Sequence, residues 1–338
     1  MACISLFFNL FLTQPVQQKT LTYVSLLFPP PIPISFVTIM LESNSLKTYI
    51  RQRNFLIMKS LIIALLLVPV LISAQRLHLN VTGGVSNYSG DLQNKTYTFD
   101  QSEFAFGAGI QYDITHNFSV LSNISVMKVG ASDQFNRPSL QFRNLSFQTS
   151  ILEWNLLGEY TFLDINRSAF SPFIFGGIAV FHFDPYAYDT LQRKTYLKPL
   201  STEGEGLPQY PGQKPYSLTQ FAIPLGGGIK FRVSENIILA YEVGFRKTFT
   251  DYLDDVSTFY VDKSILQAQK GGEAVEMAYR AGQIKGGSPT YPTEGTIRGN
   301  KKYKDMYYYN GIRISIALMY KRDPYYGRGR TDCPTGVQ

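Results

Sequence analysis

One histidine and two serines are the residues of this 338-residue chain that could carry out nucleophilic chemistry. His182 precedes Asp184 by two positions, and Ser201 and Ser217 follow in the same segment. A serine becomes a nucleophile when a histidine takes its proton and a carboxylate orients that histidine. One histidine among many serines is weak support for such a site, because a histidine at the end of an apolar segment needs no catalytic role. We therefore assign no catalytic residue and expect a protein that is not an enzyme.

The residue types that hold metals, cofactors or nucleic acids are too scattered to form such sites. Cys3 and Cys333 stand at opposite ends of the chain, and the three histidines lack the spacing of a metal site. Glycine runs such as Gly226-Gly227-Gly228 lie inside alternating segments, not between a strand and a helix, so a phosphate-binding loop is not expected. The formal net charge of +7 comes without a basic run. We expect no cofactor and no nucleic-acid partner.

The elements that position these residues are segments with an alternating, period-2 pattern, which is typical of membrane-spanning β-strands. The clearest one has apolar residues at every second position over most of its length: Phe221, Ile223, Leu225, Ile229, Phe231 and Val233. Another repeats the pattern with Ile312, Ile314, Ile316, Leu318 and Tyr320. The segments of this kind are 77–88, 104–114, 118–132, 144–163, 170–183, 219–233, 237–249 and 305–320. Eight is the smallest usual number of strands in a closed barrel.

The connections between these segments alternate in length. Short polar turns at 115–117, 164–169 and 234–236 alternate with longer connections at 89–103, 133–143, 184–218 and 250–304. Outer-membrane barrels have short periplasmic turns and long extracellular loops. The sequence therefore predicts an all-β protein, an eight-stranded antiparallel transmembrane β-barrel with long extracellular loops and both chain ends in the periplasm.

A water-soluble β-sandwich or lipocalin-like barrel would also alternate, but with its apolar side chains inside. Two further observations favour the membrane. One is the asymmetry of the loops, and the other is a set of aromatic residues near the strand ends that resembles an interfacial girdle. The members of this set are Tyr307, Tyr308, Tyr309, Phe181, Phe183 and Phe249.

An export signal is the third observation that favours the outer membrane. Met58-Lys59 precedes an apolar run over 61–72 and then Ser73-Ala74-Gln75, which is the order of a secretory signal peptide. We expect residues 58–74 to be a Sec signal, 75–320 the barrel and 321–338 a short periplasmic tail. Residues 1–57 then lie upstream of the true start, although a genuine N-terminal extension is the alternative.

If the apolar faces contact lipid, the opposite faces place charges of both signs inside a narrow lumen. These residues are Glu153, Glu159, Lys230, Arg232, Glu242, Arg246 and Arg313. An unpaired buried charge costs several kcal/mol, so we expect a luminal ion-pair network that plugs the barrel. A gated conduit is the alternative.

Several segments together resemble a known family. They are Gly83-Gly84, Tyr88-Ser89-Gly90-Asp91-Leu92, Pro172-Phe173-Ile174-Phe175-Gly176-Gly177, His182-Phe183-Asp184-Pro185, Leu197-Lys198-Pro199-Leu200, Glu203-Gly204-Glu205-Gly206, Phe221-Ala222-Ile223-Pro224-Leu225-Gly226-Gly227-Gly228 and Thr250-Asp251-Tyr252-Leu253-Asp254-Asp255-Val256-Ser257. In order and spacing they resemble the PorG-like outer-membrane β-barrels of the type IX secretion system, over essentially all of 75–320. The resemblance implies an eight-stranded barrel that tethers a periplasmic ring of PorK/PorN-type (GldK/GldN-type) proteins to the outer membrane, without catalytic residues.

The tail after Tyr320 is a candidate partner-docking segment, with Arg328, Arg330 and Cys333 as its candidate contact residues. Cys333 is the single cysteine after the signal, and a lone thiol in an oxidising compartment can pair between chains. An unpaired cysteine without a role is the equal alternative. For the whole protein, the alternatives to a secretion component are a small transport barrel for solutes or lipids and an outer-membrane enzyme that uses His182.

The two longest loops are too long for passive connections. The prolines of 184–218 restrict the chain, and we expect no core there. Residues 265–281 could form one helix, and the Asp254-Asp255 pair is interpreted as an ordinary loop pair. Both loops are expected to cover the barrel mouth or meet an external partner, or else to be solvated.

Overall fold

A computed structural model describes residues 77–95, 97–165 and 168–318. The expected signal at 58–74, the segment 1–57 and the tail at 321–338, with Arg328, Arg330 and Cys333, lie outside the described residues.

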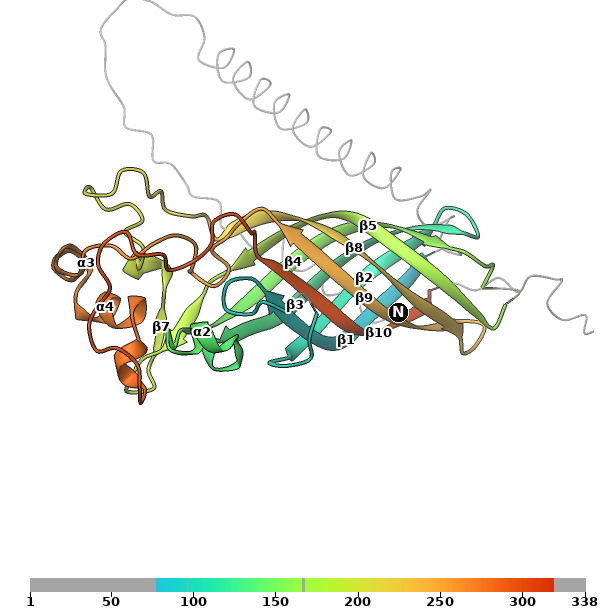
Figure 1. The fold of residues 1–338 in the computed structure, drawn as a ribbon. Helices are drawn as coiled ribbons and strands as arrows, with labels where there is room; N and C mark the ends of the chain where they lie inside the picture. The colour runs from blue at the N-terminus through green and yellow to red at the C-terminus, as the bar shows by residue number, and fades with distance from the viewer. Residues whose placement is uncertain (1–76, 96, 166–167, 319–338) are drawn as a thin grey trace, which may run out of the picture. The chain divides into compact units, whose positions relative to one another are not determined.

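Eight long antiparallel strands of the described residues form a closed barrel (Figure 1). They are β1 (Leu77–Ser89), β2 (Glu103–Asp113), β3 (Phe118–Ser132), β4 (Ser146–Thr161), β5 (Phe170–Phe183), β8 (Thr219–Arg232), β9 (Ile237–Thr248) and β10 (Met306–Ala317). The strands neighbour one another in the order β3-β2-β1-β10-β9-β8-β5-β4, and pairing of β3 with β4 closes the ring. The predicted eight-stranded antiparallel barrel is confirmed. Closure removes the unpaired sheet edges that an open sheet would expose.

The chain ends of the barrel lie on the side of the short connections. The turn between β2 and β3 is tight, because the amides of Ile114 and Thr115 both donate to the carbonyl of Phe118. β1 and β10 pair over their whole length, from His78 opposite Ala317 to Ser89 opposite Met306. The amide of Leu318 also donates to the carbonyl of Leu77, at 2.9 Å. The first and last described residues therefore lie together at that end.

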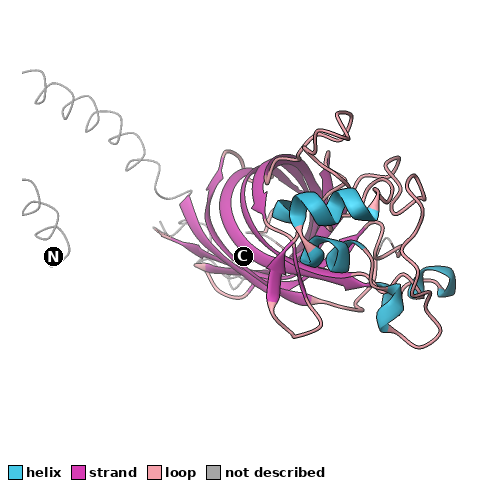
Figure 2. Cartoon of the chain, turned by 90° about the vertical axis from the view of Figure 1, so that its left-hand side faces the viewer, coloured by secondary structure: helices cyan, strands magenta, loops and turns pink. Residues whose placement is uncertain are grey.

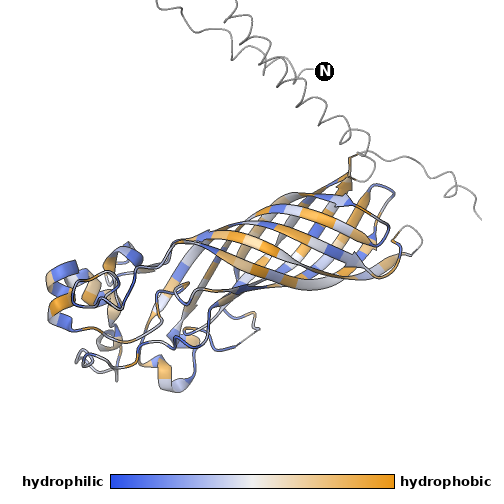
Figure 3. Ribbon diagram, turned by 90° about the horizontal axis from the view of Figure 1, so that it is seen from above, coloured by the Kyte–Doolittle hydropathy of each residue, from blue (hydrophilic) through white to orange (hydrophobic). Residues whose placement is uncertain are grey.

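The barrel has its apolar side chains outside and its charged side chains inside. Phe231 and Ile314 are 46% and 40% exposed, whereas Glu153 and Glu159 are completely buried. Figure 3 shows hydrophobic and hydrophilic residues alternating along the strands. Because successive side chains of a strand point to opposite faces, this arrangement follows directly from the period-2 pattern. A water-soluble barrel would have the reverse orientation.

The prediction of an aromatic girdle is wrong for five of its six residues. Tyr307, Tyr308, Tyr309, Phe181 and Phe183 are buried, and Phe249 alone of the predicted set is exposed. The rings of Phe181 and Tyr307 pack edge to face inside the barrel, with centroids 5.3 Å apart. The outer end of β10 is covered on both faces, because Tyr308 is packed beneath Tyr97. These aromatic residues therefore build the core of the barrel mouth and not a surface belt.

The long connections fold over one end of the barrel. We call residues 184–218 and 249–305 the cap. Its regular elements are β6 (Tyr186–Tyr188), β7 (Lys194–Tyr196), η3 (Lys198–Leu200), α3 (Lys263–Lys270), α4 (Gly272–Ala278) and η4 (Ala281–Gln283). The adjoining loop between β3 and β4 holds η2 (Asp133–Phe135) and α2 (Pro138–Gln141). Figure 2 shows the helices gathered at one end of the strands. Among the described residues, every helix is too short or too polar to cross a membrane.

Two expectations for the cap need correction. Residues 184–218 do contribute a core, since Leu207 and Tyr210 pack with Val261 and Leu266 of the other long loop. The helix expected over 265–281 is broken into α3 and α4 at Gly271, whose φ of 89° lies outside the helical region. The expectation of no core in residues 184–218 was wrong because burial against a distant loop leaves no periodic signal in the sequence.

Candidate functional site

Three charged side chains form an ion cluster in the half of the barrel lumen that lies farther from the cap. The Glu159 carboxylate from β4 pairs with the Lys230 ammonium from β8 and with the Arg313 guanidinium from β10. Lys230 also donates to the Thr161 hydroxyl at 3.0 Å. All three charged side chains are buried. One carboxylate thus pairs with two cations that come from other strands of the barrel wall.

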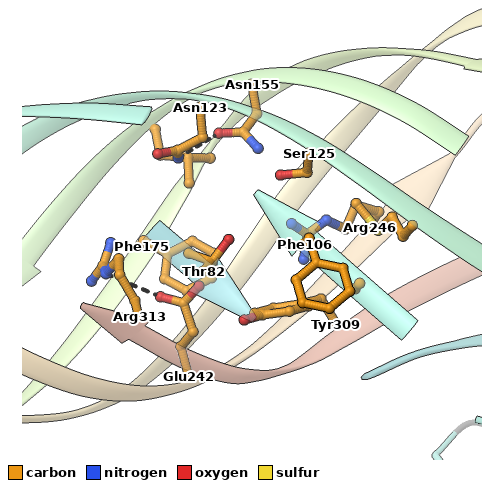
Figure 4. A pocket seen from close by; sticks show the side chains of 13 residues that line it. Thr82, Phe106, Asn123, Ser125, Asn155, Phe175, Glu242, Arg246, Tyr309 and Arg313 are labelled. Carbon is orange, nitrogen blue, oxygen red and sulfur yellow. Dashed lines mark hydrogen bonds and ion pairs between the residues drawn. The ribbon is translucent and has the colours of Figure 1, made fainter. Parts of the chain in front are cut away.

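A second group of charges lies nearer the mouth. Arg246 of β9 donates to both oxygens of Glu153 at 3.2 Å, and the Tyr307 hydroxyl and the Asn155 amide donate to the same carboxylate at 2.7 Å. Glu242 lies between the two groups, 3.4 Å from Arg313 Nε. Figure 4 shows the ion pair between Glu242 and Arg313, which come from the neighbouring strands β9 and β10.

The structure brings six of the seven predicted luminal charges together in this way. The exception is Arg232, which is half-buried at the end of β8 and donates from Nε to the carbonyl of Ser234 at 3.4 Å. Arg232 therefore belongs to the rim of the barrel. The other six, named here the luminal network, are Glu153, Glu159, Lys230, Glu242, Arg246 and Arg313.

A cavity between the two groups of charges is small. It has a volume of about 20 Å³ and is lined by residues that include Thr82, Ser125 and Asn155 (Figure 4). A space of this size holds about one water molecule. A hydrated solute has no room there.

The cap has its own buried ion pair. Arg298 Nη1 lies 2.9 Å from Glu203 Oε1. The same carboxylate accepts from the amides of Ser257 and Thr258 and from the Thr258 hydroxyl, at 2.6 to 2.9 Å. Glu203 belongs to the first long loop and the other three residues to the second. This carboxylate therefore fastens the two long loops together.

A second arginine ties the β3–β4 loop to the cap. Arg143 donates from Nε and Nη2 to the two oxygens of Asp133, at 2.7 and 2.8 Å. Its Nη1 donates to the carbonyl of Arg298 at 2.5 Å, and its Nη2 also contacts the carbonyl of Asp91. The two-pronged geometry is the one in which a guanidinium binds a carboxylate best.

Other cap carboxyl groups are buried with mainly neutral partners. Asp255 accepts from the Thr202 hydroxyl at 2.5 Å and the Tyr216 hydroxyl at 2.7 Å. Burial raises the pKa of Asp255 to about 6, against the opposing charge of Arg298. Burial, with the nearby charges of Asp255 and Glu203, raises the pKa of Glu205 to about 8. These groups titrate near neutral pH, unlike a solvated carboxylate.

The base of the cap holds three more acidic residues. The Tyr88 hydroxyl, at the end of β1, lies 2.6 Å from Asp254 Oδ2 and 2.8 Å from Asp305 Oδ1. Asp251 accepts from the Ser257 hydroxyl at 2.7 Å, and burial raises the pKa of Asp251 to about 7. The Asp254-Asp255 pair is therefore fully buried and not an ordinary loop pair as interpreted from the sequence. The concentration of acidic and aromatic residues in Thr250–Ser257 is the signal that sequence reasoning left unused.

A cleft of about 830 Å³ opens on the cap. Arg137 and Leu140 line it on one side, and Tyr210, Phe259 and Ile297 are among its other lining residues. Its volume is that of a small-ligand site.

The residues considered for nucleophilic chemistry do not form a catalytic arrangement. His182 is exposed on the barrel exterior, and its Nδ1 lies 3.0 Å from the Thr219 hydroxyl. The Ser217 hydroxyl donates to the carbonyl of Thr219, and Ser201 is buried in the cap at the end of η3. The described contacts thus join His182 to a threonine and not to either serine.

Sequence comparison identifies the family of the chain. Residues 56–268, more than half of the chain, match the domain of unknown function DUF6089. The chain belongs to this family. No curated protein matches it.

Solved structures with a similar fold include outer-membrane proteins. Neisserial surface protein A (NspA) has a TM-score of 0.35 at 8% identity, and the match covers 72% of this chain and 97% of that one. OprG from Pseudomonas aeruginosa has a TM-score of 0.35 at 10% identity, with coverages of 73% and 98%. The outer-membrane enzyme PagL has a TM-score of 0.28 at 10% identity, with coverages of 72% and 99%.

Proposed function

We propose that this member of the DUF6089 family is a non-enzymatic, structural outer-membrane component of the type IX secretion machinery. In this role the barrel anchors a periplasmic ring of PorK/PorN-like or GldK/GldN-like proteins to the membrane. The membrane part of the proposal and the secretion part have different supports, and they are tested separately.

Outer-membrane insertion is supported by the outer surface of the barrel. Its exposed side chains include Phe104, Phe106, Ile178, Phe221 and Leu225, each more than half exposed. A soluble monomer rarely exposes a continuous apolar surface of this extent, whereas lipid tails solvate it without cost. Because the barrel is closed, its strands leave no edge whose backbone N–H and C=O groups would need water as a hydrogen-bond partner.

The proposed orientation places the cap outside the cell. The short connections and both described ends of the chain lie at the end of the barrel opposite the cap. Outer-membrane barrels keep their short turns in the periplasm. Residues 321–338 would then start on the periplasmic side, where a ring component could bind them.

The luminal network is the single observation that carries the structural role. Its buried ion pairs fill the barrel interior, and the cavity between them holds about one water molecule. A barrel built in this way supports a role as an anchor rather than a conduit. The type IX assignment rests on the resemblance of the quoted segments between Gly83 and Ser257.

Affinity purification of the tagged protein from membranes of the native host tests the tether. We expect periplasmic ring proteins to co-purify with the full chain and to be lost when a stop codon follows Tyr320. Arg328→Ala with Arg330→Ala should weaken recovery, and Cys333→Ser should abolish any disulfide-linked species.

Lys301→Ala, on the cap side, is the control and should leave recovery of the ring proteins unchanged. Equal recovery with and without the tail would remove the tail from the proposal, and absence of ring proteins from every sample would overturn the tether itself.

A small transport barrel is the alternative function, and the charged side chains among the residues that line the luminal cavity are the observation that favours it. Planar-bilayer recording separates the two functions. The tether proposal predicts no steady conductance from purified protein. A large, steady conductance that changes on Glu159→Gln would favour transport instead.

A further inference from the structure

One tyrosine hydroxyl stands between two buried carboxyl groups where the cap meets the barrel. Tyr88 at the end of β1, Asp254 in the long loop and Asp305 just before β10 are each 1% exposed. The phenol oxygen lies 2.6 Å from Asp254 Oδ2 and 2.8 Å from Asp305 Oδ1. Both distances are those of a hydrogen bond between oxygen atoms.

The number of protons decides the state of this site. A tyrosine hydroxyl has one proton to donate and lone pairs to accept with, and an ionised carboxylate can only accept. Tyr88 can therefore donate to one of the two aspartates, and the second contact is a hydrogen bond only if the other aspartate donates. If both carboxylates were ionised, one buried carboxylate oxygen would face the phenol oxygen with no hydrogen atom between them.

The backbone amides that donate to the two aspartates do not supply the missing proton. The amide of Val256 donates to Asp254 Oδ1 at 2.9 Å and the amide of Leu253 donates to Asp305 Oδ2 at 2.8 Å. These bonds satisfy the carboxyl oxygens that point away from Tyr88. Within the described residues, neither aspartate forms an ion pair.

We infer that Asp254 and Asp305 hold a single proton between them through Tyr88, and that this proton-binding site latches the cap to the mouth of the barrel. Either aspartate can be the acid, because reversing the direction of both hydrogen bonds gives an equivalent arrangement. The protonated site joins three separate parts of the chain: β1, the start of the 249–305 loop and its end.

The charged surroundings favour the protonated form. Asp91 acts on both aspartates and Asp251 on Asp305 with negative charge, whereas Arg143 acts on Asp254 with positive charge and Lys304 acts on Asp251. Burial raises the pKa of Asp254 and of Asp305, and the repulsion between acidic neighbours raises both further.

The backbone is shaped to fit the site. A Cβ atom at Gly90 would lie 2.0 Å from the Tyr88 hydroxyl and 2.1 Å from Asp305 Oδ1. No side chain fits there without displacing one of the three groups. The glycine therefore lets the chain turn back directly over the shared proton.

Loss of the proton should open the latch. Two negative charges would then face one hydroxyl in a site with little access to water, and the aspartates would separate. Because the folded pKa is raised, the stabilisation is complete at low pH and is lost as the pH rises through that pKa. The cap should loosen from the barrel in alkaline solution.

Infrared spectroscopy tests the proton directly. The full chain is refolded in detergent with ¹³C-labelled aspartate, and the carboxylic-acid band that moves with the label is measured at pH 8.5. At that pH Asp255 and Asp251, with pKa values of about 6 and 7, are ionised and do not contribute. We expect a protonated aspartate band in the native chain and its loss in both Asp254→Asn and Asp305→Asn.

Asp100→Asn is the matched control, since Asp100 is an exposed partner of Lys95 whose ion pair lowers its pKa. This variant should keep the band. Absence of the band from the native chain, or its survival in both site variants, would overturn the proposal. Circular dichroism of each variant establishes that the barrel has folded before the spectra are compared.

Hydrogen exchange of residues 250–261 gives a second, independent readout. An asparagine at 254 or 305 donates an N–H to Tyr88 at every pH, so each variant should keep the segment protected at alkaline pH values where the native chain has lost its protection. Protection that is raised by added Ca²⁺ and removed by EDTA would instead indicate a bound cation and would overturn the shared proton.

Discussion

The lumen and the cap both bury acidic side chains, but they neutralise them in different ways. In the lumen, Glu159 meets Lys230 and Arg313. In the cap, Asp254 and Asp305 meet one tyrosine hydroxyl, and Asp255 meets a threonine and a tyrosine. Full ion pairs stay charged over the whole physiological range, whereas burial raises the pKa of Asp255 to about 6 and that of Glu205 to about 8, so these two cap carboxyl groups titrate near neutral pH. We therefore expect the stability of the cap to depend on pH much more than that of the barrel lumen.

The geometry of strands and loops explains the difference. A closed barrel projects side chains from facing strands to a common interior, so oppositely charged residues that are distant in sequence meet there. The cap is held together by loops, which place the Arg298 guanidinium on Glu203 but satisfy the oxygens of Asp254, Asp255 and Asp305 with nearby amides and hydroxyls. Four changes test this contrast, from the largest expected effect to the smallest.

Glu159→Leu should be the most damaging of these changes. It removes the carboxylate partner of the buried Lys230 and leaves Arg313 with only its longer contact to Glu242, and breaking a buried pair in this way costs about 3–5 kcal/mol. Guanidinium unfolding of the detergent-refolded barrel measures the loss. Glu235→Leu, in the exposed turn between β8 and β9, is the control. A loss below about 1 kcal/mol would mean that the plug does not depend on charge pairing.

Gly90→Ala should damage the cap but not the barrel ladder. The added methyl group collides with Tyr88 and Asp305, and overpacking of this kind costs about 1–3 kcal/mol. Hydrogen exchange should accelerate in 250–261 and stay unchanged in β4 and β5. Gly212→Ala is the matched control, because a Cβ atom there meets nothing within 4 Å. Equal acceleration in strands and cap would remove the distinction between the two regions.

Raising the pH should loosen the cap selectively. Asp255, Asp251 and Glu205 have folded pKa values raised to about 6, 7 and 8. Their stabilisation is complete below the unfolded values and is lost as the pH rises through the folded values. Between pH 5.5 and 9, exchange in the cap, corrected for its intrinsic pH dependence, should rise by about tenfold or more while strand exchange changes little. A cap that tightens over this range would contradict the assignment.

Arg232→Ala should have the smallest effect. Its side chain is only half-buried at the rim of the barrel, and interactions at partly exposed sites contribute less than about 1 kcal/mol. Guanidinium unfolding of the detergent-refolded barrel measures this loss as well. A loss comparable to that of Glu159→Leu would return Arg232 to the luminal network.

The strands could be predicted from the sequence to within three residues, because alternation is a local property of the chain. Phe231 and Ile314 face outward as the pattern requires. The girdle assignment failed at Tyr307–Tyr309, where distant loops cover β10 on both faces. The expectation of no core in residues 184–218 and the interpretation of the Asp254-Asp255 pair were wrong for the same reason, because contacts between two long loops have no periodicity.

The sequence by itself determined the strands, their order along the chain and which side chains face away from the charges, since these follow from the period of a β-strand. The tertiary structure decided which charges meet. The register between neighbouring strands around the ring places Lys230 and Arg313 on Glu159 and leaves Arg232 at the rim. It also decided that the base of the cap closes on Tyr88, because residues more than 160 positions apart come together only when the ring is complete.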